Sequence, residues 1–153
     1  NHAIDNIQNV TVAAGFTRQI SENANKTAYY SNAYALGLAY NFVHTTYGLD
    51  LERQVTKNQG DKRTKNEVRA VIRQGLNEDW NVYAMYAYKT DKQFGDTDRT
   101  RQFMVGTEYY VYNQGSLKVK PFLEWQATRT KYENSTVDRS RDFKTVIGLR
   151  AYW

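Results

Sequence analysis

The feature that most constrains this chain is an alternation of apolar and polar residues with a period of two. Successive side chains of a β-strand point to opposite faces, so this period predicts strands with one apolar face each. Helical spacing fits none of the stretches as well. The sequence therefore predicts an all-β fold of about eight strands in a single domain, residues 1–153. The alternating stretches cover residues 10–16, 34–42, 47–51, 68–76, 80–88, 103–111, 117–127 and 143–153.

The segments between these stretches alternate in length. The short ones, near residues 43–45, 77–79 and 113–116, contain turn-forming residues such as Asn77 and Gly115. An antiparallel up-and-down meander with tight turns at one end and long loops at the other is the expected result. The predicted long loops are polar and charged, and they cover residues 19–28, 56–65, 90–100 and 129–141.

Composition narrows the class of protein. The chain has no cysteine, which excludes disulfide frameworks, thiol nucleophiles and thiolate metal sites. No apolar run approaches the roughly 18–20 residues that a membrane-spanning helix needs. The 21 Lys and Arg residues are interspersed with 16 Asp and Glu residues, so we expect no nucleic-acid partner.

The two faces of the predicted strands differ in bulk and charge. One carries Val, Leu, Ile and aromatic residues, and the other carries glycine and ions of both signs. An eight-stranded barrel is only just wide enough inside for its side chains, so the small, charged set fits there and the bulky set does not. A soluble, lipocalin-like barrel with an apolar interior is the alternative. The expected fold is thus a transmembrane β-barrel with short periplasmic turns and long extracellular loops.

Acids and bases occur together on the face expected to line the barrel. Unpaired charges are costly in so narrow a bore, so we expect them to form an internal network that plugs it. This predicted lumen charge network comprises Asp50, Glu52, Glu67, Arg69, Arg73, Glu108, Lys118, Lys120, Glu124, Lys144 and Arg150.

Aromatic residues on the other face gather toward the two ends of the strands, with an aliphatic belt between them. Two such girdles are typical of the two interfaces of a bilayer. Arg53 also falls on this face, near the long-loop end, where it can extend to lipid headgroups. The predicted girdle residues are Phe16, Tyr34, Phe42, Tyr47, Trp80, Tyr86, Phe103, Tyr109, Trp125, Phe143 and Trp153.

The last stretch, which alternates from Phe143 through Ile147 and Leu149 to Trp153, resembles the C-terminal strand of bacterial outer-membrane proteins. In those proteins a terminal aromatic residue, usually Phe, belongs to the signal for the outer-membrane assembly machinery. Strand number and length resemble the small eight-stranded barrels of the OmpA/OmpX type. The resemblance implies a location in the bacterial outer membrane, with lipid, lipopolysaccharide and the assembly machinery as partners. Because Asn1 is not followed by an apolar signal region, an exported protein would be in its mature form.

The last hairpin is also similar to the oligogalacturonate-specific porin family. The similarity lies in residues 120–124, in the charged segment through Asp138 and Arg139, and in residues 146–149. That family has more strands than the eight counted here, and the similarity implies a channel for sugar acids.

No catalytic constellation is found in the sequence. His2 and His44 lie near no Ser–acid pair at a recognisable spacing, and no phosphate-binding loop or metal cluster is present. We therefore expect no enzymatic activity and no cofactor.

Two functions remain open. The leading hypothesis is a closed or barely conducting barrel whose loops serve adhesion, envelope integrity, lipopolysaccharide contact or binding of an extracellular ligand. The alternative is a small porin-like channel for anionic solutes or sugar acids. Basic side chains in the predicted loops are candidates for contact with the phosphates of lipopolysaccharide: Lys57, Lys62, Arg63, Lys65, Arg99 and Arg101.

Overall fold

The computed structural model describes residues 8–22, 28–58, 61–114, 117–134 and 139–152. All of the regular structure in these residues is β-strand. No described segment is a helix long and apolar enough to cross a membrane. The strands are β1 (Gln8–Glu22), β2 (Ala28–Phe42), β3 (Thr45–Asn58), β4 (Asp61–Gly75), β5 (Trp80–Gln93), β6 (Asp96–Tyr109), β7 (Tyr112–Gln114), β8 (Leu117–Lys131) and β9 (Arg139–Tyr152).

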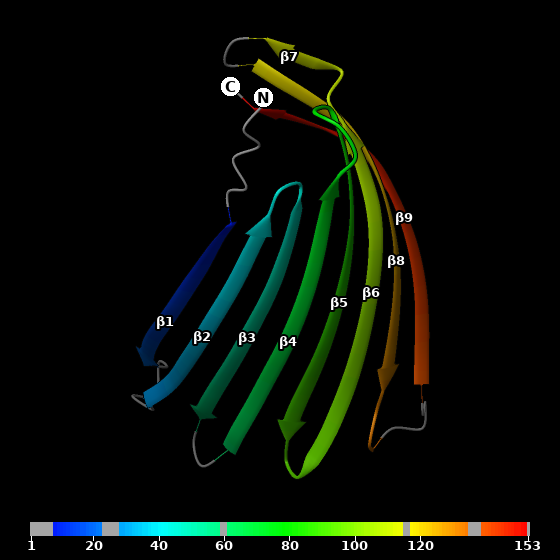
Figure 1. Cartoon of the computed structure of the whole chain (residues 1–153). Coiled ribbons are helices and arrows are strands. Elements are labelled where there is room, and N and C mark those ends of the chain that lie inside the picture. The colour runs from blue at the N-terminus through cyan, green and yellow to red at the C-terminus, as the bar shows by residue number, and fades with distance from the viewer. Residues whose placement is uncertain (1–7, 23–27, 59–60, 115–116, 135–138, 153) are drawn as a thin grey trace.

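The strands form one antiparallel sheet in which neighbours in sequence pair with each other (Figure 1). Each strand from β1 to β6 pairs with the next, β6 then pairs with β8, and β8 pairs with β9. The three-residue β7 pairs with the beginning of β8. The eight long strands therefore make the up-and-down meander that the alternation predicts.

The sheet is strongly curved, and β1 and β9 form its two edges (Figure 1). Within the described residues no pairing joins β1 to β9. One side of each edge strand therefore has no strand partner there, and the predicted closure into a barrel is not a feature of the described sheet.

The alternation places each side chain of the long strands on one of two faces. Every ladder runs without a slip in register, so paired residues share a face. One face holds contacts between strands that are not neighbours, such as Arg73 of β4 with Glu108 of β6, and it is therefore the concave face. The buried Tyr83 and Ala87 lie on it. The convex face carries the apolar side chains, and Leu149 on it is 72% exposed.

Two of the four predicted long loops are wrong, and the other two are shorter than predicted. Only two residues separate β3 from β4, and only two separate β5 from β6. Residues 56–65 and 90–100 thus belong mostly to strands, and β1 and β8 also continue into their predicted loops. Backbone pairing does not depend on side-chain polarity, so polar residues extend the ladders instead of ending them. We call the end of the sheet where β1 joins β2, β3 joins β4, β5 joins β6 and β8 joins β9 the distal end, and the opposite end the proximal end.

The connection between β5 and β6 is a two-residue hairpin turn formed by Phe94 and Gly95. Their φ angles are 50° and 90°. Positive φ at both central positions is characteristic of the type I′ turn, whose twist matches that of two antiparallel strands. This turn lets both strands keep their pairing to the distal tip.

Pro121 lies where β8 changes partner. The ladder between β6 and β8 ends at the pair Glu108–Phe122. On the other side of Pro121, residues Leu117 to Val119 of β8 pair with β7. A proline has no N–H to donate, so the sheet tolerates it at the position where the neighbouring strand changes. At Pro121 the neighbour of β8 on this side therefore changes from β6 to β7.

Candidate functional site

Glu108 of β6 is the most buried charged side chain among the described residues, at 2% exposure on the concave face. Its Oε1 lies 2.5 Å from Nη1 of Arg73 and 3.3 Å from Nζ of Lys120. Its Oε2 lies 3.2 Å from Nη1 of Arg150. These cations belong to β4, β8 and β9, so a single carboxylate joins side chains from four strands.

Glu124 and Tyr83 extend this group of charges. Nη2 of Arg150 lies 2.6 Å from Oε1 of Glu124, and the Tyr83 hydroxyl donates a hydrogen bond of 2.5 Å to the same oxygen. The guanidinium of Arg73 lies 5.2 Å from the centre of the Tyr83 ring. We call this group the Glu108 cluster: Arg73, Tyr83, Glu108, Lys120, Glu124 and Arg150.

Two glycines make room for rings beside this cluster. Gly106 is the register partner of Tyr83, and Gly148 is the partner of Phe122. A Cβ atom at Gly106 would lie 2.5 Å from the Tyr83 ring, and one at Gly148 would lie 2.6 Å from the Phe122 ring. Each ring therefore lies over the glycine of the next strand. In this position the Tyr83 hydroxyl reaches past β6 to Glu124 on β8.

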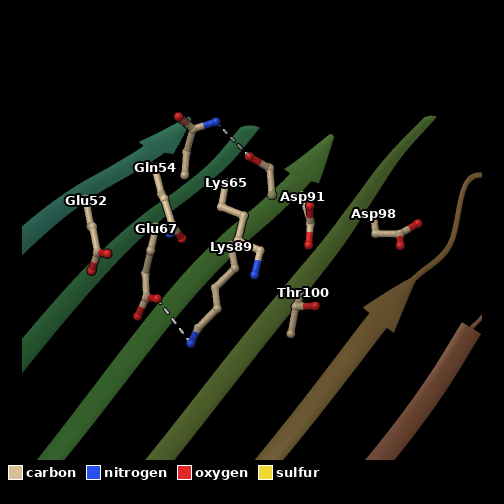
Figure 2. A pocket seen from close by; sticks show the side chains of 10 residues that line it. Glu52, Gln54, Lys65, Glu67, Lys89, Asp91, Asp98 and Thr100 are labelled. Atoms are coloured by element: carbon tan, nitrogen blue, oxygen red, sulfur yellow. Dashed lines mark hydrogen bonds and ion pairs between the residues drawn. The ribbon is translucent and has the colours of Figure 1, made fainter. Parts of the chain in front are cut away.

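A second group of charges lies on the concave face nearer the distal end (Figure 2). Glu67 of β4 forms two ion pairs: its Oε1 lies 2.8 Å from Nη2 of Arg69, and its Oε2 lies 3.1 Å from Nζ of Lys89 on β5. Glu67 and Lys89 line a cavity of about 300 Å³ in which acids and bases are mixed. The other charged lining residues are Glu52, Lys65, Asp91 and Asp98.

At the distal tips of β4 and β5, Arg63 and Asp91 form a two-pronged ion pair. Nε of Arg63 donates to Oδ1 of Asp91 at 2.8 Å, and its Nη2 donates to Oδ2. These hydrogen bonds lower the pKa of Asp91 below its ordinary value. The pair ties two strands together in a region that the sequence predicts as loops.

The predicted lumen residues all belong to the concave face by register. The structure brings Glu67 and Arg69 into the distal group, and it brings Arg73, Glu108, Lys120, Glu124 and Arg150 into the Glu108 cluster. Among the described residues, no ion pair is formed by Asp50, Glu52 or Lys144. The side chain of Lys118 lies outside the described part of the chain.

The predicted girdle residues belong to the convex face, apart from Trp153, which lies outside the described residues. Their exposure ranges from 39% for Trp125 to 69% for Phe143. The ring centres of Phe103 and Trp125 are 6.4 Å apart, and those of Trp125 and Phe143 are 6.0 Å apart. Exposed rings thus contact one another across β6, β8 and β9. The other described members are Phe16, Tyr34, Phe42, Tyr47, Trp80, Tyr86 and Tyr109.

The sequence places Arg53 on the convex face and indicates Lys57, Lys62, Arg99 and Arg101 as exposed cations, but sequence reasoning missed that these and further cations share one face. Continuing the period of two past Phe103 on β6 leads to Arg101 and Arg99, and the same count on other strands leads to further cations. The signal is present in the sequence, but eight of the eleven cations fall in segments predicted as loops. All members are exposed and lie at the distal end; we call them the convex cations: Arg18, Arg53, Lys57, Lys62, Lys92, Arg99, Arg101, Arg129, Lys131, Arg139 and Arg141.

The acids are sorted to the opposite face. Among strand residues whose side chains the structure describes, every Asp and Glu belongs to the concave face by register. The convex face of the same residues carries positive charge alone. The concave acids are Asp50, Glu52, Asp61, Glu67, Asp91, Asp96, Asp98, Glu108, Glu124 and Asp142.

The sheet thus has a concave face rich in charges of both signs and a convex face rich in apolar side chains. The described residues hold no group of three or more His, Asp or Glu side chains placed to bind a metal ion. His44 is exposed in the turn between β2 and β3, and His2 lies outside the described residues. Four of the ten described concave acids form ion pairs, namely Glu67, Asp91, Glu108 and Glu124.

Comparison with protein-family models, with curated proteins and with solved structures finds no match.

Proposed function

We propose that this sheet is the wall of a transmembrane β-barrel of the small OmpA/OmpX-like type in a bacterial outer membrane. The barrel is closed to solutes or barely conducting, and its role is in adhesion, envelope integrity or contact with lipopolysaccharide. The observation that carries the proposal is the sorting of charge between the two faces. A lipid-facing surface requires an uncharged belt, with polar and charged side chains on the other face of each strand. A sheet that faces water on its convex side has no need to exclude acids from it.

Strand length supports the same proposal. The long strands have 14 or 15 residues. A tilted strand crosses the hydrocarbon core with roughly 9–11 residues, so several residues of each strand extend beyond it. The charged distal ends are that extension. They form a rim that takes the place of the predicted loops in contacts with lipopolysaccharide or with an extracellular ligand.

The two edges of the sheet give a reason for closure. Each unpaired backbone group costs several kcal/mol in hydrocarbon, so bare edges on β1 and β9 are unfavourable in a bilayer. Pairing β1 with β9 satisfies both edges at once. The assembly machinery of the outer membrane, which recognises a C-terminal strand, is the proposed partner in this step.

The Glu108 cluster supports a plugged bore. Its six side chains come from five strands and are joined by ion pairs and a hydrogen bond. In a closed eight-stranded barrel the interior has room for little beyond its side chains. A cross-linked set of this kind leaves no continuous water path at the proximal end.

Refolding and conductance together test the proposal. The urea-unfolded chain is refolded into phosphatidylcholine vesicles and run on a detergent gel with and without heating. We expect faster migration of the unheated sample, which is the mark of a closed barrel, and no large, stable openings in planar bilayers. Equal migration of the two samples and free solubility without detergent would contradict the membrane proposal.

The open sheet also favours a second function, a small channel for anionic solutes or sugar acids. A wall completed by more strands than the eight long ones described here has a wider bore, in which water and solutes fit. Reproducible openings with anion preference would support this function. Replacement of Arg69, Arg73 and Arg150 by glutamine would then weaken that preference, and unchanged ion selectivity would argue against it.

A further inference from the structure

Six of the convex cations form two rows across three neighbouring strands. Arg101 of β6 is the register partner of Arg129 of β8, which is the partner of Arg141 of β9. In the next row toward the distal end, Arg99, Lys131 and Arg139 are partnered in the same way. All six side chains are exposed on one face. We call this group the six-cation cluster.

Like charges directly opposite each other on neighbouring strands destabilise a sheet. Each row of three cations contains two such pairs of like charges. None of the six cations forms an ion pair with a described acid, whereas the concave face neutralises most of its buried charge. The cost of this repulsion is removed when an anion lies among the six side chains.

The geometry of the cluster suits phosphate. Among the described residues, the lining of a cavity of about 250 Å³ consists of Arg99, Arg101, Arg129, Lys131 and Arg139. Guanidinium groups bind phosphate through two parallel hydrogen bonds, and four of these five residues are arginines. Rows two residues apart lie about 7 Å from each other and strands lie about 4.8 Å apart, so the cluster has the width to hold more than one phosphate group.

The neighbouring surface suits acyl chains. On the proximal side the cluster borders the rings of Phe103 and Phe143, and both of these rings lie beside the ring of Trp125 in the following row. Beyond Phe103 an almost wholly apolar hollow of about 500 Å³ lies along β4, β5, β6 and β8. Val105 and Leu123 line it, four residues from Arg101 and six from Arg129 along their strands. Charge, aromatic rings and an apolar hollow thus follow one another in the order of a lipid headgroup, its interface and its tails.

We propose that the six-cation cluster is a specific binding site for an acylated lipid whose headgroup carries two or more phosphates, the chemistry of the lipid A part of lipopolysaccharide. This inference rests on the proposed membrane location, because the lipid reaches the convex face from the bilayer. It assigns the contact to β6, β8 and β9. Of the residues suggested by sequence, Arg99 and Arg101 belong to the site, whereas Arg63 and Lys65 lie on the concave face.

The test uses the whole chain refolded in phosphatidylcholine bicelles, with lipid binding counted by native mass spectrometry. The probes are bis-phosphorylated lipid A, the same lipid without phosphates, and inorganic phosphate. The cluster variant is R101Q/R129Q/R141Q. Its matched control, R53Q/K57Q/K62Q, removes the same charge from the same face on β3 and β4. We expect the cluster variant to bind the phosphorylated lipid about a hundredfold more weakly than the unaltered chain, and the control to change by less than about threefold.

Each other result overturns the inference in a recognisable way. Equal losses in the two variants would show a diffuse basic rim without a site. Equal binding of the dephosphorylated lipid would remove the role of phosphate, and equal competition by inorganic phosphate would remove the role of the lipid. Insertion is scored separately, by heat-dependent gel migration in pure phosphatidylcholine. A chain that inserts there but does not discriminate among the probes overturns this inference alone, and a chain that does not insert overturns the proposed function with it.

Discussion

Nη1 of Arg73 on β4 lies 2.5 Å from Oε1 of Glu108 on β6, with β5 running between the two strands. A contact across an intervening strand requires the sheet to curve toward that face. The same carboxylate reaches Arg150 on β9 across β8. Glu108 therefore ties the curvature of the wall to the charges that fill its concave side.

Replacing Glu108 by glutamine is expected to destabilise the chain by about 1–3 kcal/mol, because the buried Lys120 loses its acid and the partly exposed Arg73 and Arg150 each lose an ion-pair partner. The measurement is the free energy of unfolding in urea, with the protein in phosphatidylcholine vesicles. D142N is the matched control, since Asp142 is an exposed acid of the same face and forms no described ion pair. It should change stability by no more than about 0.5 kcal/mol. Similar losses in both variants would show that the Glu108 cluster has no special role.

Replacing Gly106 by alanine is expected to cost about 1–3 kcal/mol, because the added Cβ would lie 2.5 Å from the Tyr83 ring. The ring has little freedom to move, since its hydroxyl is bonded to Glu124. In G48A the nearest atom, Cβ of Val71, lies at an ordinary 3.8 Å, so this control should keep full stability. Thermal unfolding in the same bicelles compares the two, and a G106A variant as stable as G48A would refute the packing argument.

The sequence predicted the strands and the faces but not their ends. A period of two depends only on the backbone, so the eight long strands and the concave position of Glu108 follow from it. The strand ends differ from the prediction because polar residues such as Arg63 and Asp91, which favour loops by composition, join neighbouring strands instead. The Glu108 cluster could not be assembled from sequence, because its contacts join strands that are not neighbours and depend on the curvature of the sheet.

Replacing Leu49 by arginine tests which solvent the convex face meets. Leu49 lies mid-strand on β3 and is 36% exposed. In a bilayer the charge should cost about 2–4 kcal/mol. A T64R variant, on the same face but at the distal end of β4, should cost no more than about 0.5 kcal/mol. Unfolding of both in phosphatidylcholine vesicles is the measurement, and equal stabilities would place the face in water.

Closure can be tested with disulfides, because the chain has no cysteine of its own. A cysteine at Ala14 of β1 is combined in turn with one at Thr145, Ile147 or Leu149 of β9. We expect one of these pairs to oxidise within a single chain in vesicles, since disulfides form only when the Cα atoms lie about 4.4–6.8 Å apart. A14C with V68C, on strands three ladders apart, is the control and should remain reduced. Disulfide-linked dimers in place of the intramolecular bond would mean that a second chain meets the edge.

Because the convex cations all lie at the distal end, the two ends of the sheet differ in charge. A chain inserted in the opposite direction would place its cationic end in the other leaflet. The anionic leaflet would then meet the turns at the proximal end. If the sheet is the proposed membrane wall, two leaflets of unequal charge are not interchangeable for it, and the bilayer itself would select the direction of insertion.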